Sequence, residues 1–103
     1  MTQQQKMKMA FMTFSPGSDP SKHRSMISTD IVDFITVMVP DRNQAVVVAK
    51  KLAAEGCTII ELCSGFGHNL TAMVADAVKD KAMVGAVRFD FVPFLGQSGD
   101  KIF

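Results

Sequence analysis

The residues that could do chemistry gather in one segment, ELCSGFGHN, from Glu61 to Asn69. It holds a carboxylate at Glu61, a thiol at Cys63 and an imidazole at His68. Groups of these three kinds transfer protons or attack electrophilic centres in enzymes. The segment is therefore the first candidate for an active or binding site.

The same segment predicts an anion site at the start of a helix. Apolar residues recur at helical spacing over Leu70–Lys81, with Asn69 as the expected N-cap. Free N–H groups and positive partial charge at a helix start suit phosphate or carboxylate. The glycines would allow φ > 0 and a close backbone approach, although they could equally just shape a tight turn, and neither GxGxxG nor GK[ST] is present. The expected binding residues here are Ser64, Gly65, Gly67 and Asn69.

Glu61, Cys63 and His68 are the candidates for catalysis. Glu61 interrupts an apolar strand, so it is expected either to act as a general acid or base or to pair with Arg88 on a neighbouring strand. Cys63 ends that strand before a sharp turn, where a nucleophile could be activated with His68 as its base or ion partner. A cysteine in this position is also often an inert apolar side chain.

Alternating apolar segments predict the elements that would position these residues. β-Branched and apolar runs favour strands over Met7–Phe14, Ile31–Val39, Cys57–Cys63 and Met83–Phe91. Between the first two strands, Asp19 and Pro20 predict the start of a short helix that runs through Met26. A longer helix is expected over Arg42–Glu55, with Asp41 and Gln44 as a capping box, Gly56 as its stop, and one apolar stripe made of Ala45, Val48, Ala49, Leu52 and Ala53.

This order predicts a small α/β fold. We expect an open, mostly parallel, four-stranded sheet in the strand order second, first, third, fourth, with helices on both faces, flavodoxin-like and possibly half-size. Because the first crossover is barely long enough for a helix, an α+β sheet with one antiparallel pair is the alternative. Residues 1–6 are expected to be a flexible extension, and residues 7–103 a single domain.

An open parallel sheet binds ligands at the carboxyl ends of its strands. His23 and Arg24 would reach this edge after the first strand, and Arg88 and Asp90 at the end of the fourth. Together with the Glu61–Asn69 segment they would form a crevice for a small anionic molecule. We expect the tail Ser98–Phe103 either to close over this crevice or to dock on a second subunit.

Composition argues against nucleic acid and membranes as partners. The formal net charge is +1, which gives no electrostatic footprint for nucleic acid or an anionic membrane. Two unpaired cysteines and the absence of an apparent export signal favour the cytoplasm. Hydrophobic residues make up 48% of the chain, so a second copy could cover part of the apolar surface, although a well-filled core would also account for them. No ligand spacing predicts a metal, and the cofactor, if there is one, is unknown.

The segments PGSDPSKHR, IELCSGFGH, VGAVRFD and SGDKIF resemble a family of short bacterial α/β proteins grouped as a domain of unknown function. The resemblance covers about residues 10–103. It implies that the four segments belong to one domain, and it brings no reaction with it.

Two functions remain open from the sequence, and whether the protein is an enzyme is uncertain. The first is a small-molecule-handling protein that holds an anionic group at the Gly65–Asn69 helix start, with acid–base or thiol chemistry from Glu61, His68 and Cys63. The alternative is a non-catalytic oligomeric binding or scaffold domain in which Glu61 and Arg88 form a structural pair.

Overall fold

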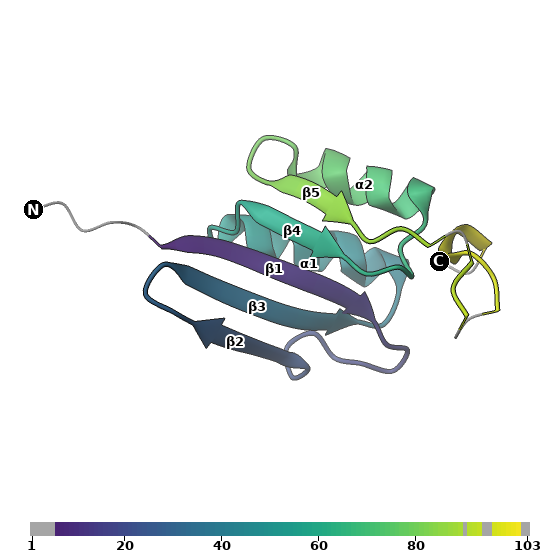
Figure 1. Cartoon of the computed structure of the whole chain (residues 1–103), viewed down its shortest axis with the longest axis horizontal. Coiled ribbons are helices and arrows are strands. Elements are labelled where there is room, and N and C mark those ends of the chain that lie inside the picture. Colours follow the sequence, from purple (N-terminus) through teal and green to yellow (C-terminus); the bar gives the residue numbers. More distant parts are fainter. Residues whose placement is uncertain (1–5, 90, 94–95, 102–103) are drawn as a thin grey trace, which may run out of the picture.

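The fold is a mixed β-sheet with two α-helices, seen in a computed structural model that describes residues 6–89, 91–93 and 96–101 (Figure 1). The described strands form one five-stranded sheet in the order β2-β3-β1-β4-β5, in which β2 is antiparallel to β3 and the other neighbours are parallel. The strands are β1 (Met7–Phe14), β2 (Arg24–Ser28), β3 (Val32–Val39), β4 (Ile59–Leu62) and β5 (Met83–Ala86). The helices are α1 (Arg42–Ala54) and α2 (His68–Val78), followed by a 3-10 turn at Gly99–Lys101.

The α/β class is confirmed, and so is the antiparallel pair of the alternative prediction. The four strands predicted from the sequence also lie in the predicted order, as β3-β1-β4-β5. A sheet of four strands was wrong, because β2 adds a fifth at the edge. The flavodoxin-like detail finds no support in this mixed sheet.

Helices on both faces were also wrong for the part of the chain that the structure describes. α1 and α2 contact each other and lie behind the strands in Figure 1, so they share one face of the sheet. The core lies between this face and the helices, where the inward side chains of β1, β3 and β4 are fully buried: Ala10, Met12, Ile35, Val37, Val39, Ile60 and Leu62. The opposite face of the sheet carries no helix among the described residues.

The predicted first helix is replaced by strand β2. Asp19 does cap a turn, since its carboxylate accepts from the Ser21 backbone N at 2.9 Å and from the Ser21 hydroxyl at 2.7 Å. The turn ends at once, and Arg24–Ser28 pairs along β3. A crossover this short cannot hold a packed helix, whereas a strand satisfies its backbone groups immediately.

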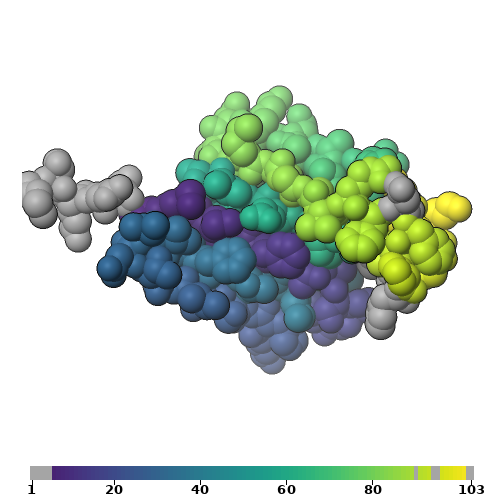
Figure 2. Space-filling model, viewed as in Figure 1, coloured from purple at the N-terminus to yellow at the C-terminus, as the bar shows by residue number. Residues whose placement is uncertain are grey.

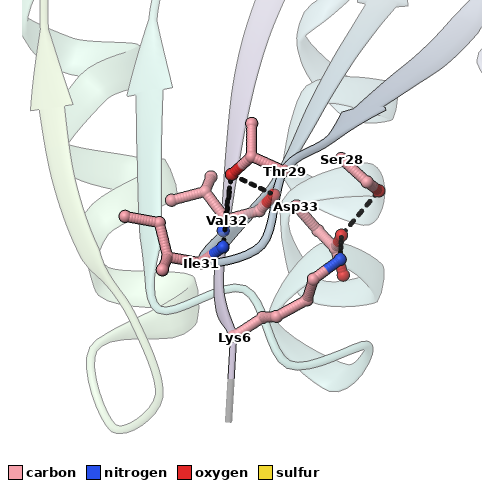
Figure 3. A network of polar contacts seen from close by, with 6 residues as sticks. All are labelled: Lys6, Ser28, Thr29, Ile31, Val32 and Asp33. Carbon is pink, nitrogen blue, oxygen red and sulfur yellow. Dashed lines mark hydrogen bonds and ion pairs between the residues drawn. The ribbon is translucent and has the colours of Figure 1, made fainter. Parts of the chain in front are cut away.

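A polar network closes the β2–β3 hairpin (Figure 3). The Thr29 hydroxyl oxygen accepts from the Val32 backbone N at 3.1 Å, which holds the turn. Beside it, Asp33 accepts from the Ser28 hydroxyl at 2.6 Å and pairs with Lys6 at 3.1 Å. These contacts, the Ser28 hydrogen bond first, lower the pKa of Asp33 below its ordinary value.

Helix α1 follows the prediction closely. The Asp41 carboxylate accepts from the Gln44 backbone N at 2.8 Å, and the predicted apolar stripe is buried. Gly56 has φ of 106°, which glycine adopts without strain, and it ends the helix. The other boundaries shift: β4 and β5 are shorter than expected, and α2 covers His68–Val78 rather than Leu70–Lys81.

Candidate functional site

Residues 63–67, called the glycine turn below, connect β4 to α2. Gly67, not Asn69, is the N-cap residue, and its φ of −79° lies in a region open to any residue. Gly65 is likewise absent from the described positive-φ glycines, so the expected left-handed backbone at these two positions is wrong. Glycine is required at position 67 for space, because a Cβ there would overlap the carboxylate of Asp100.

The C-terminal segment Ser98–Lys101 docks against this turn. Gly99 lies so close to the Gly65 carbonyl that a Cβ on Gly99 would overlap it. Asp100 Oδ1 accepts from the Asn69 backbone N at 3.2 Å, at the start of α2. The chain's own carboxylate therefore occupies the helix-start position predicted for a ligand anion, and the described part of the tail packs on the turn between β4 and α2.

His68 links Asp100 to Arg88. His68 Nδ1 lies 3.4 Å from Asp100 Oδ2, and His68 Nε2 accepts from Arg88 Nε at 3.0 Å. An imidazole nitrogen that accepts a hydrogen bond carries no proton, so the neutral ring holds its proton on Nδ1, facing the carboxylate. Asp100, His68 and Arg88 thus form a continuous polar chain across the start of α2.

A pocket of about 500 Å³ lies between α2 and the strand-to-tail segment after β5. Its apolar lining includes the small side chains of Ala72 and Ala75 on α2 and of Ala86 on β5. The Asp100–His68–Arg88 chain also lines the pocket, together with Ser64 and Thr71.

The structure brings together part of the predicted site. Ser64, Gly67, His68 and Arg88 line this pocket, and Asn69 contributes its backbone amide to Asp100. Cys63 does not line the pocket, since it packs half-buried against the core. Its role as a nucleophile stays a prediction without geometric support.

His23 and Arg24 lie elsewhere, contrary to expectation. His23 Nδ1 accepts from the Asp19 backbone N at 2.8 Å within the turn before β2. Arg24 pairs with Glu55, the C-cap residue of α1, at 3.0 Å. Because β2 replaces the predicted helix, Arg24 is directed to the end of α1, and His23 stays within the turn before β2.

Glu61 faces away from the pocket. It is the neighbour of Phe11 on β1 and of Gly85 on β5, on the sheet face opposite the helices. Arg88 lies on the other side, where it donates to His68. No ion pair joins Glu61 and Arg88 among the described residues, and they lie on opposite faces of the sheet, so the structural pair stays a prediction without geometric support. Glu61 as an acid or base of the same site loses its geometric basis as well.

The sequence did not single out Asp100 or Phe66. Asp100 lies in the tail Ser98–Phe103, but nothing in the sequence distinguishes it as the group that accepts a hydrogen bond at the start of α2. Phe66 is buried, and its ring centroid lies 4.4 Å from that of Phe14 at the end of β1. This ring contact anchors the glycine turn to the sheet. An aromatic residue between two glycines is the feature of the sequence that could have indicated it.

Metal and thiol chemistry gain no site in the described part of the chain. No group of three His, Cys, Asp or Glu side chains there could hold a metal ion. Cys57 is buried, and this burial raises the pKa of its thiol.

Neither described helix is long and apolar enough to cross a membrane. Asp90, Ile102 and Phe103, named in the sequence predictions, lie outside the described residues.

Comparison with known proteins places the chain in a family. The model of DUF6506, a family of unknown function, matches residues 7–99. The chain belongs to DUF6506. The match confirms the resemblance to a domain of unknown function, and within DUF6506 it spans every strand, both helices and the pocket lining up to Gly99. No curated protein and no solved structure matches the chain.

Proposed function

We propose that this DUF6506 member binds a small molecule with an apolar body and one anionic group in the pocket between α2 and β5. The observation that carries the proposal is the pocket itself, whose lining combines small apolar side chains with the linked polar side chains of His68, Arg88 and Asp100. Ligand sites in proteins commonly have this composition.

Arg88 is the residue that would hold the anionic group. A guanidinium presents planar donors that match a carboxylate or a phosphate, and Arg88 lines the pocket, where its Nε donates to His68. Asp100 already lies at the start of α2. The ligand anion is therefore assigned to Arg88, and the helix amides serve the chain's own tail.

His68 would supply any proton transfer. Asp100 faces Nδ1 and so orients the ring, which leaves Nε2 as the basic nitrogen at the pocket. When a ligand anion takes the Arg88 guanidinium, Nε2 is free to accept a proton from the ligand. A histidine oriented by a carboxylate is a common general base. Such a proton transfer requires that the ligand first binds in the pocket.

The test is calorimetric titration and thermal shift with carboxylates of increasing alkyl length and with phosphate monoesters. We expect one series to stabilise the wild type at millimolar concentration, since a ligand that binds only the folded state raises its stability. Arg88→Gln should weaken that binding at least about tenfold, the loss expected when a charged hydrogen bond is removed.

Arg42→Gln is the matched control, because Arg42 lies on α1 outside the pocket lining and should leave binding unchanged. Absence of any shift across both series would overturn the proposal. Equal losses in the two arginine variants would show that charge alone, not the pocket, attracts the anion.

A further inference from the structure

An apolar row of side chains crosses all five strands on the face of the sheet opposite the helices. The strand register aligns one residue from each strand in a single row on this face: Ile27, Phe34, Met9, Ile59 and Met83. The two ends of the row are strongly exposed, with Met83 at 77% and Ile27 at 65%. Figure 2 looks onto this face, with β1 in purple between β3 in blue and β4 in teal.

The next row toward the carboxyl ends of the parallel strands is more polar, since it contains Ser25, Thr36 and Glu61 beside Phe11. Apolar side chains continue outside these two rows, at Met7 and Val32 on one side and at Met38 on the other. Glu61 is the one charged side chain among the described strand residues of this face. A parallel sheet is normally covered on both faces, so a face of this composition lacks its second layer.

The dimensions fit a protein interface. Five strands at about 4.8 Å and up to eight residues at about 3.3 Å give a flat footprint of roughly 500 Å². Protruding side chains raise the accessible area above that footprint, toward the roughly 800 Å² that each partner buries in a standard interface. A pocket ligand could not cover this area, whereas a second sheet could.

We propose that a second copy of this chain covers the open face, with the two sheets packed face to face about a two-fold axis. Two stacked sheets bury their facing side chains in a layer about 10 Å thick. Such an interface uses the same patch on both copies, and a nearly uncharged apolar patch is self-complementary. The inference is independent of the pocket, which lies on the helix side of β5.

The position of Glu61 selects the direction of the axis. The row that contains it is, in strand order, Ser25, Thr36, Phe11, Glu61 and Gly85. An axis along the central strand β1 would place Glu61 opposite the partner's Thr36, whose hydroxyl can donate to the carboxylate. An axis along the row itself would instead place the two Glu61 carboxylates against each other, and like charges in contact are costly.

Solution mass by light scattering tests the interface. We expect the wild type to have twice the 11.2 kDa mass of the chain. Ile27→Lys/Met83→Lys should be a folded monomer, because both side chains are exposed in the single chain. Val47→Lys, at an apolar position on α1 that is 42% exposed, should stay dimeric. A monomeric wild type, or dissociation by Val47→Lys alone, would overturn the proposal.

A charge variant tests the axis. Thr36→Lys should face the partner's Glu61 and lower the dimer dissociation constant about tenfold, within the range of measured charge-pair couplings. Thr36→Lys/Glu61→Gln should lose this gain. If Thr36→Lys weakens the dimer while circular dichroism shows it folded, lysine faces lysine, and the axis along β1 is wrong.

Discussion

Gly67 is needed because of what lies beside it. Its backbone is ordinary, but a Cβ would overlap the Asp100 carboxylate and approach the Asp100 backbone N to 2.5 Å. Gly67→Ala should therefore push Ser98–Lys101 off the turn. We expect faster amide hydrogen exchange in that segment and a loss of about 0.5–1 kcal/mol in the free energy of unfolding, because the start of α2 loses the Asp100 carboxylate.

Gly85→Ala is the control, since nothing lies within 4 Å of a Cβ at that position. It should leave the hydrogen exchange of Ser98–Lys101 unchanged, because Gly85 lies on the sheet face away from that segment. In a chain that ends at Gln97, Gly67→Ala should cost almost nothing. An equal cost in both chains would show that the segment is not what excludes a side chain at position 67.

At the residue scale, the sequence predicted the parts of the site that are local. Ser64, Gly67 and His68 are close in the chain and share one strand-to-helix turn, so any fold that keeps the turn keeps them together. Asp100 reaches Asn69 from 31 residues away, and its place depends on how the tail packs. Such a long-range contact cannot be predicted from the types and spacing of residues along one chain.

At the element scale, Asp41 is the clearest local signal. Its carboxylate accepts from the Gln44 backbone N and so satisfies one free donor at the start of α1. Asp41→Ala should lower the free energy of unfolding by about 1 kcal/mol in urea titrations. Asp41→Asn should keep most of the stability of the wild type, because asparagine also caps helices. Asp80→Ala, in the exposed turn after α2, should be neutral. Equal losses at both positions would point to net charge instead of capping.

The hairpin shows why a good cap signal is not a helix. Asp19 offered the same cap chemistry as Asp41, and both carboxylates do accept backbone hydrogen bonds. After Asp41 comes a long apolar stripe that buries against the sheet, whereas Arg24–Ser28 after Asp19 is exposed and has no such stripe. Helix stability in proteins comes mainly from tertiary packing, so the segment forms a strand on β3 instead.

At the scale of the whole molecule, apolar strands predicted two covered faces, and the described residues cover one. The prediction assumed that every crossover contains a helix, which fails where β2 forms an antiparallel hairpin. The apolar composition of β1, β3 and β4 includes most of their outer residues, with Thr13, Thr36 and Glu61 as exceptions. The missing layer is what the proposed dimer would supply.

The role of the tail at this scale is testable by deleting Ser98–Phe103. The described part of the tail docks on the glycine turn of its own chain, not on the open sheet face. We expect the shortened chain to keep the solution mass of the wild type. Its unfolding free energy should fall by about 0.5–1 kcal/mol, because the start of α2 loses a carboxylate. Full-length Asp100→Asn should reproduce most of that loss. A change of mass on deletion would instead place the tail between subunits, the other role that the sequence left open.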